Sequence, residues 1–523
     1  MDDRQAAANS MMKSAAALKM DDDIIEIEEE ADTSTNASPR PSCLTPDRQA
    51  LADSIMESVK ASVCKLRRGD PPTIYIVPRT IRQVNEVAYE PEMVSIGPYH
   101  NGKERLQGME ENKLLYLHSF LSRNPKHPLE DYLKEMEELE DEARSCYSEK
   151  VGPLMRKEFV KMMVLDACFI VEIFLRFHPD KLGLLTQQWK ELKHNEEDLG
   201  LISAFLFHSN GFEDPIRHAI GKVYYPRYDM LLLENQIPFF VLQRIFKMAC
   251  PVNAPHLLEK LALDFFDHVM PMNKEIEIKD SYYHLLHLFH SHLIPTRNDG
   301  KEKHNLLCNP IIKYVLNKSK KLLMFLPCSN EPTTEPRKMI PCATDLQLAG
   351  VKFKKIKESN NILNVKFSHG VLEITPFLIH DHSDTLFRNL VAFEQCCLEA
   401  KIHFFTTYIV FMDFLVNTSN DVALLHHNGI IDNFLGSDDE VAHLFNRLCI
   451  GIFHTFKRSY LSDVKDNVQK HSENRWNMWR ASLKRDYFTN PWSVISLIAA
   501  SILLLLTIIQ TFFSVFPYYR PRS

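Results

Sequence analysis

The chain has 523 residues, of which 45% are hydrophobic and 25% are charged, a balance that excludes a disordered protein as a whole. The net charge of −7 provides no general basic field, so a nucleic-acid partner is not expected. The 15 glycines are under half the usual share of about 7%, which makes glycine-rich phosphate loops scarce.

The N-terminal residues 1–45 predict an acidic, disordered arm, because eight acidic residues crowd positions 21–32. Within the arm, Ile24, Ile25 and Ile27 precede a run of carboxylates. This pattern is similar to a SUMO-interacting motif, in which a short strand adds to a sheet edge. The three isoleucines are therefore candidate partner-binding residues, and a plain solvated tail is the alternative.

The next part, residues 46–486, predicts a single domain made mainly of helices. Apolar residues have helical spacing over 47–68, 112–121, 129–146 and 159–177, and 73–78 reads as a short strand that ends at a proline.

The segment 159–177 is apolar on most of its circumference, which is typical of a helix inside a large core. Lys161, Glu172 and Arg176 share one edge of this helix, whereas Asp166 lies off that edge. An unpaired buried carboxylate is costly, so Asp166 is expected to have a partner.

A second apolar run, 230–246, is interrupted at 234–236, and Asn235 is expected to cap a helix that holds Pro238 in its first turn. The clearest β signal lies at 351–374, where 364–367 and 371–374 predict a hairpin. Helices resume at Leu386 and continue with breaks to about Arg485. The expected fold is mainly α, with a small β element in a large helical body.

At the C-terminal end, positions 487–519 contain no charged residue. The 25 residues from Trp492 through Leu504 to Phe516 are long enough, at about 1.5 Å each, to cross a ~30 Å hydrocarbon core. The sequence therefore predicts a transmembrane helix at 492–516 followed by a short tail at 517–523. A buried core helix is the alternative.

Basic residues predict the orientation of this helix. They are Arg475, Arg480, Lys484 and Arg485 before it, and Arg520 and Arg522 after it. The excess before the helix favours a cytosolic body, held at the plasma membrane or endoplasmic reticulum. If the body were lumenal instead, Asn317 and Asn417 would be glycan acceptors.

Eleven cysteines are scattered without a CxxC pair, which favours free thiols in a reducing compartment. Cys168 and Cys396 are expected in the core.

Two groups of histidines are candidate metal-binding sites. His284, His287 and His290 share a helical spacing to which Asp280 would add a ligand, although a polar helix face is the alternative. The loop 380–384 (HDHSD) also suits the N-terminal turn of a helix. No nucleotide-binding motif occurs, so no cofactor, metal or catalytic residue is assigned.

Asp166, Glu234 and Glu394 lie in apolar settings, where paired carboxylates would perform acid–base chemistry. Buried salt bridges to arginines such as Arg144 or Arg388 are the alternative.

Many motifs in this order resemble one plant-specific family, the domain-of-unknown-function 247 family. They are 76–78 (IVP), 89–91 (YEP), 94–100 (VSIGPYH), 109–113 (MEENK), 143–147 (ARSCY), 159–166 (FVKMMVLD), 231–239 (LLLENQIPF), 349–353 (AGVKF), 388–394 (RNLVAFE) and 487–492 (YFTNPW).

The resemblance covers about residues 74–515. It implies a mainly helical protein with a C-terminal hydrophobic span and no established catalytic activity. Some grass members look like male-side determinants of self-incompatibility.

The expected function is that of a membrane-anchored recognition or signalling protein acting through an unidentified protein partner. The segment 95–100 reads as a packed turn, and Ser95, Tyr99 and His100 are the candidate partner-binding residues if the turn is exposed. An enzyme that uses a carboxylate or histidine site is the first alternative, and a structural membrane scaffold that oligomerises is the second.

Overall fold

The computed structural model of the protein describes part of the chain: residues 51, 54–56, 71–149, 154–177, 196–208, 224–251, 253–273, 276–294, 340–357, 361–397, 403–454, 456, 459–474, 479 and 491–519. Internal contacts divide the chain into two units, Met1–Gly69 and Asp70–Ser523. The predicted acidic arm, with Ile24, Ile25 and Ile27, lies outside the described residues. Of the helix expected over 47–68, the described residues 51 and 54–56 are helical.

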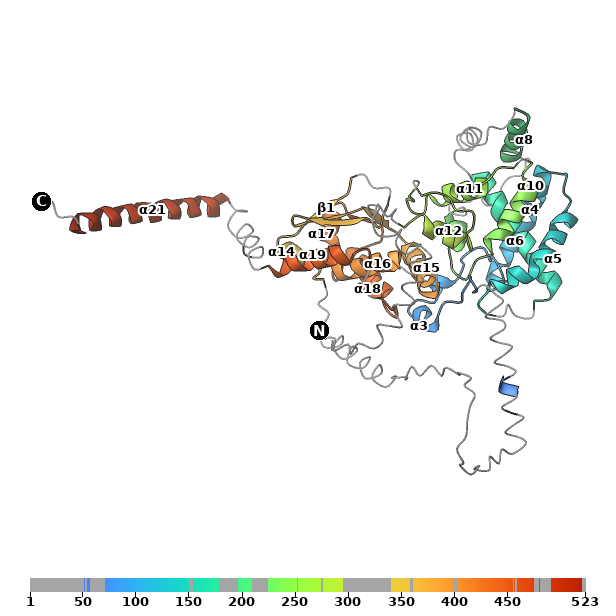
Figure 1. The fold of residues 1–523 in the computed structure, drawn as a ribbon, viewed down its shortest axis with the longest axis horizontal. Coiled ribbons are helices and arrows are strands. Elements are labelled where there is room, and N and C mark those ends of the chain that lie inside the picture. The colour runs from blue at the N-terminus through green and yellow to red at the C-terminus, as the bar shows by residue number, and fades with distance from the viewer. Residues whose placement is uncertain are drawn as a thin grey trace, which may run out of the picture. The chain divides into compact units, whose positions relative to one another are not determined.

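The second unit is mainly helical, as expected from the sequence (Figure 1). Its first half contains α3 (Arg79–Arg82), η1 (Val87–Tyr89), η2 (Glu104–Leu106), α4 (Gln107–Arg123), α5 (Leu129–Ser145), α6 (Arg156–Phe177), α8 (Glu196–Phe207), α9 (Tyr224–Asp229), α10 (Phe239–Ala249), α11 (Leu257–Phe266) and α12 (Leu285–Ser291). Its second half contains α14 (Ala343–Leu348), β1 (Lys352–Lys355), β2 (Val365–Ser368), β3 (Val371–Ile374), β4 (Phe377–Ile379), α15 (Ser383–Cys396), α16 (Phe404–Leu415), α17 (Ser419–His427), β5 (Ile431–Asn433), α18 (Asp438–Leu448), α19 (Ser462–Glu473) and α21 (Pro491–Tyr519).

Helix α6 is the centre of the first half and packs against α4, α5, α10 and α11 (Figure 1). Its residues from Phe159 to Leu175 are buried on nearly every side, which confirms the helix predicted from their apolar pattern. Cys168 is buried among them as a free thiol, also as expected.

Two local predictions in this half are wrong for the same reason. Residues 73–78 form no strand beyond a single bridge between Ile74 and Tyr147, and Asn235 does not cap α10, whose N-cap is Pro238. In both places a side chain forms a long-range bond instead of the local one expected. The Val77 N–H is bonded to the Glu234 carboxylate rather than to a strand, and the Asn235 side chain accepts from the Ile96 N–H rather than capping a helix.

The predicted hairpin is confirmed, since β2 and β3 pair antiparallel around His369 and Gly370, both of which have positive φ. Strand β1 joins the other edge of β3 in parallel, so the sheet order is β1-β3-β2. The short parallel pair of β4 and β5 was missed, because three-residue strands carry little periodic signal.

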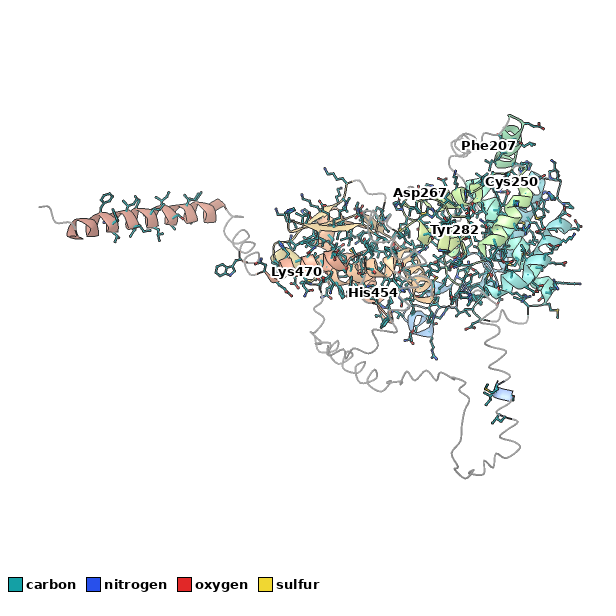
Figure 2. The ribbon with its side chains drawn as sticks, viewed as in Figure 1. Phe207, Cys250, Asp267, Tyr282, His454 and Lys470 are labelled. Carbon is teal, nitrogen blue, oxygen red and sulfur yellow. The ribbon has the colours of Figure 1, made fainter. Side chains whose placement is uncertain are left out.

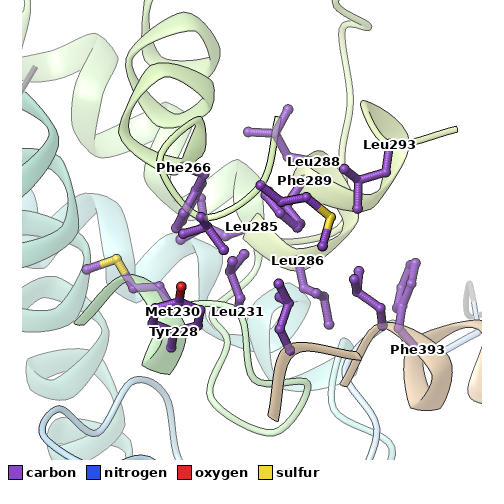
Figure 3. Packing of buried hydrophobic residues seen from close by; sticks show 14 of the residues in the cluster. Tyr228, Met230, Leu231, Phe266, Leu285, Leu286, Leu288, Phe289, Leu293 and Phe393 are labelled. Carbon is purple, nitrogen blue, oxygen red and sulfur yellow. The ribbon is translucent and has the colours of Figure 1, made fainter. Parts of the chain in front are cut away.

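Buried apolar side chains from both halves meet around α12. Figure 3 shows Leu285, Leu286 and Phe289 of α12 gathered with Leu231, from the connection before α10, and with Phe393 of α15. A single hydrophobic cluster therefore continues from the helices of the first half into those of the second half.

Helix α21 includes Trp492, Leu504 and Phe516 in its range. The four consecutive leucines 503–506 are each more than half exposed, and the side chains drawn on α21 in Figure 2 project to both sides of the helix. The predicted transmembrane helix gains no support from the described residues, among which no helix combines the length and apolarity needed to cross a membrane.

Candidate functional site

A set of four buried side chains joins two stretches of irregular backbone. Asp166, Asp229, Glu234 and Asn235 accept hydrogen bonds from the backbone N–H groups of residues within 77–97. We call these four side chains the polar junction. These four residues lie in or next to the motifs that carry the family resemblance. Their contacts therefore indicate whether those motifs have a structural or a catalytic role.

Asp229 carries the largest share of these bonds. Its carboxylate accepts from the N–H groups of Glu92, Met93 and Val94 at 2.7–2.8 Å. Asp229 is 2% exposed, and it is the last residue of α9. No regular element pairs with residues 92–94, so this one carboxylate replaces the partners that a strand would supply. The only local signal for this role is an acid next to an apolar run.

Asn235 uses both ends of its amide in the same junction. Its Oδ1 accepts from the Ile96 N–H at 2.7 Å, and its Nδ2 donates to the carbonyls of Val94 and Asp229. With 0% exposure and three bonds, it is satisfied within the protein.

Glu234 lies where the junction approaches the surface. It accepts from the Val77 N–H and forms an ion pair with Arg82, and its Oε2 lies 3.7 Å from Nε2 of His100. Burial and the neighbouring Lys103 lower the pKa of His100 to about 4, although Glu90 opposes the shift. The imidazole therefore stays neutral at physiological pH, and Arg82 supplies the positive charge beside Glu234.

Asp166 has the partner that its position on α6 requires. Lys113 of α4 donates to Asp166 Oδ1 at 2.6 Å, to the Ser95 carbonyl at 2.6 Å and to Glu110 at 2.7 Å, while the Gly97 N–H donates to Asp166 Oδ2. Burial alone would lower the pKa of Lys113, but the carboxylates of Asp166 and Glu110 raise it. The pair is thus a buried ion pair with its hydrogen bonds filled.

Gly97 allows the close approach on which this arrangement depends. We expect Gly97→Ala to lower the free energy of unfolding by roughly 2–4 kcal/mol, because its φ is +71° and an added Cβ would lie 2.3 Å from the Gln236 carbonyl oxygen. The measurement is denaturant unfolding of the purified chain. Gly102→Ala is the matched control, since Gly102 also has positive φ but nothing within 4 Å, and equal losses in both variants would contradict the contact.

The packed turn expected at 95–100 is present, but it does not expose the candidate partner-binding residues. Ser95 is 3% and His100 is 2% exposed, and Tyr99 is partly buried with its ring 5.4 Å from that of Tyr147. Ser95 and His100 are buried, which agrees with a packed turn, and partner binding at these residues stays a prediction.

Glu394 lies in a separate cluster. It is fully buried, accepts from the N–H groups of Phe405 and Thr406 at the start of α16, and lies 2.7 Å from Nε2 of His290. Burial would raise the pKa of Glu394, but His290 and Thr406 hold it below its ordinary value. A carboxylate at a helix N-terminus stabilises the helix.

Buried pairing of the three predicted acids is confirmed, but the suggested partners are wrong. Arg144 pairs with Glu140, and Arg388 pairs with Asp384. Among the described residues, no ion pair or hydrogen bond joins any two of Asp166, Glu234 and Glu394.

The histidines of α12 act as structural groups. His284 caps α12 through Nδ1, which accepts the His287 N–H, while its Nε2 donates to the Thr73 carbonyl at 3.1 Å. His287 Nδ1 accepts the Tyr283 N–H at 3.0 Å. In the described part of the chain, no three histidines, cysteines or acids gather as metal ligands.

These buried histidines predict a loss of stability in acid. Burial lowers the pKa of His284 to about 3, and that of His100 to about 4, whereas both take up protons near pH 6.5 when unfolded. The unfolded chain then binds more protons below pH 6.5, so we expect stability to be full above pH 6.5 and to fall as the pH drops toward the folded values. Between its unfolded and folded pKa values, each ring lowers the free energy of unfolding by about 1.4 kcal/mol for each unit by which the pH falls.

Unfolding free energies measured between pH 7 and pH 5 test this expectation. His284→Asn is the matched variant, because an asparagine oxygen replaces Nδ1 as the cap and does not titrate. The free energy of unfolding of this variant should fall less steeply with decreasing pH, by about 1.4 kcal/mol per pH unit. An unchanged slope would show that His284 is not held neutral.

Residues 380–384 span the start of α15, whose first residue is Ser383, as their acceptor-rich sequence predicted. His380 Nε2 lies 3.2 Å from the Tyr228 hydroxyl, and the His382 ring stacks on the Tyr228 ring at 4.5 Å. These rings pack against α9 and give no metal-binding geometry.

A groove of about 550 Å³ lies between α4 and α6. Its lining includes Glu110, Glu158, Lys161, Leu114 and Leu165. None of Asp166, Glu234, Glu394 or His380 lines it. The groove therefore lacks the buried acids on which an enzyme hypothesis depended.

Exposed apolar side chains mark a different face. Val87 is 73%, Ile450 is 48% and Phe453 is 85% exposed. Their segments are neighbours, since Arg447 donates to the Val84 carbonyl and Gly451 lies against the Thr80 carbonyl. We call Val87, Ile450 and Phe453 the apolar patch. Exposed apolar groups of this kind are typical of protein interfaces.

Comparisons with known proteins agree on one relationship. The family described as a plant protein of unknown function, DUF247, matches residues 74–506. A UPF0481 protein of Arabidopsis thaliana, At3g47200, is 29% identical over 461 residues, which cover 86% of this chain and 87% of that protein. Another UPF0481 protein of the same plant, At3g02645, is 23% identical over 513 residues, or 85% of this chain and 90% of the relative. No solved structure matches.

Proposed function

Since the chain belongs to the DUF247 family of plant proteins, whose function is unknown, we propose that it is a non-catalytic recognition protein that acts through protein partners. We further propose that α21 attaches it to a membrane with the body in the cytosol. In a grass, a male-side self-incompatibility determinant is the specific role that the family resemblance implies.

The observation that carries the proposal is that the predicted acids, Asp166, Glu234 and Glu394, form structural contacts inside the protein. Each predicted acid is bound to a cation or to backbone N–H groups, and together they hold irregular segments in place. An active site instead keeps reactive groups convergent on a cavity that a substrate enters. The polar junction thus supports a structural role for these acids, with partner recognition at the outer surface of the protein.

The apolar patch supports a protein partner. Val87 lies in η1 and the other two follow α18, and these segments are joined by the hydrogen bond of Arg447 and by the close approach at Gly451. An exposed aromatic side chain such as Phe453 is a typical anchor for an interface.

Membrane attachment is supported by the composition of α21. Positions 487–519 contain no charged residue, and the exposed leucines 503–506 cover a full turn of the helix. A helix apolar on every side is stable in lipid or in a core, but not in water.

Protease treatment of sealed microsomes that carry the N-terminally tagged chain tests attachment and orientation together. The account predicts that the chain resists alkaline extraction and that the tag is digested without detergent. Release by alkali would contradict attachment. A protected tag, with a glycosidase-sensitive mass shift at Asn417, would place the body in the lumen.

Proximity labelling in plant cells tests recognition. We expect Phe453→Asp to remove specific neighbours while its unfolding free energy stays within about 0.5 kcal/mol of the parent, because the side chain is exposed. Leu348→Asp, at another exposed site, is the control. Identical neighbours in the parent and in both variants would contradict a role for the apolar patch.

A further inference from the structure

The sheet β1-β3-β2 has one face in the core and one face outside. Phe353, Leu372 and Ile374 point into the core. On the outer face lie Lys352 and Lys354 of β1 and Lys366 of β2, all exposed. We call these three residues the lysine face.

The strand register concentrates positive charge on this face. Lys354 and Lys366 both lie opposite Glu373, which is the one acidic residue on the outer side of β3. Three lysines against one glutamate leave an excess of two positive charges. Among the described residues, no ion pair neutralises Lys352, Lys354 or Lys366.

The sheet that carries this face packs against α19, which ends shortly before α21 in the sequence. Strand β2 packs against α19, where the Phe367 and His471 rings are 5.6 Å apart. Helix α19 ends at Glu473, beside Lys470 (Figure 2), and α21 begins at Pro491. The 17 positions between them span at most about 60 Å. They add Arg475, Arg480, Lys484 and Arg485, against Asp486.

We infer that the lysine face binds the surface of an anionic lipid bilayer. This inference rests on the proposed attachment through α21. It adds that the attached protein turns the lysine face toward the bilayer. Within the described sheet, three lysines oppose one glutamate. Basic residues held next to a bilayer gain roughly fivefold in affinity for each that reaches an anionic surface.

The side-chain chemistry of the lysine face favours lipid over an acidic protein. Its remaining side chains, Val371 and Ser368, are small, so recognition depends on charge alone. A lipid headgroup layer presents charge without demanding matched pockets, and the tether keeps that layer within reach.

Amine footprinting of the full chain, reconstituted in vesicles, tests the inference. An acetylating reagent is applied in vesicles of phosphatidylcholine alone and in vesicles that also contain phosphatidylserine, and each lysine is read by mass spectrometry. We expect acetylation of the lysine face to fall roughly fivefold with phosphatidylserine and to recover in high salt. Lys134, exposed on α5, is the control and should not change.

The outcomes separate this inference from the proposed attachment. A chain that does not float with phosphatidylcholine vesicles contradicts attachment through α21. A chain that floats with both vesicles but shows equal acetylation overturns the lipid inference alone. Protection by added polyglutamate, without protection by phosphatidylserine, also overturns it and assigns the face to an acidic protein.

Discussion

Replacing Asp166 with alanine is expected to lower the free energy of unfolding by about 3–5 kcal/mol. The change takes from Lys113, at 1% exposure, its buried carboxylate partner and leaves it with the more exposed Glu110, and it removes the acceptor of the Gly97 N–H. The measurement is denaturant unfolding of the purified chain, with the slope of the transition compared to confirm that the same surface unfolds.

A paired variant separates a structural role from a catalytic one. Lys113→Met combined with Asp166→Leu removes both charges, and apolar replacement of a buried ion pair is often nearly neutral. We expect the double variant to regain at least half of the lost stability, with the remaining deficit due to the Ser95 carbonyl and the Gly97 N–H. If the Asp166 variant unfolds like the parent, the ion pair does not hold α4 against α6.

The second large effect is expected at Asp229. Asp229→Ala leaves three backbone N–H groups, those of Glu92, Met93 and Val94, without their acceptor. Each buried group left unsatisfied costs about 1–3 kcal/mol, so we expect a loss on the order of 4 kcal/mol after partial rehydration. Thermal and denaturant unfolding measure this loss.

An exposed aspartate provides the control for this variant. Asp141 lies on α5 and is exposed, so Asp141→Ala should change stability by no more than about 0.5 kcal/mol. A similarly small effect at Asp229 would show that residues 92–94 find other partners, and would remove the main support of the polar junction.

The long helices were predictable because their apolar periodicity is local. Helices α4, α5 and α6 lie where the spacing of their apolar residues placed them, within a few residues at each end. The hairpin of β2 and β3 was equally local, since its turn residues His369 and Gly370 separate two alternating runs.

The polar junction was only half predictable, because its bonds join distant residues. The apolar setting of Asp166 indicated that it has a partner, but Lys113 lies 53 positions earlier on another helix. Asp229 and Asn235 bind backbone more than 130 positions away, and that backbone forms no periodic element. A single sequence contains no local signal for such contacts.

The same limit applies to the turn at 95–100. Its glycine and proline predicted a packed turn, but they did not indicate which side chains it packs against. The burial of Ser95 and His100 depends on Lys113 and Glu234, which reach this turn from elsewhere in the fold.

Amide hydrogen exchange of the unmodified chain tests the polar junction most directly. The N–H groups of Met93, Val94, Ile96 and Gly97 belong to no helix or strand, and they are bonded to the side chains of Asp229, Asn235 and Asp166. We predict that these amides exchange as slowly as those in the middle of α6, and far more slowly than that of Gly102. Exchange as fast as at Gly102 would contradict the junction and reopen an enzymatic role for its acids.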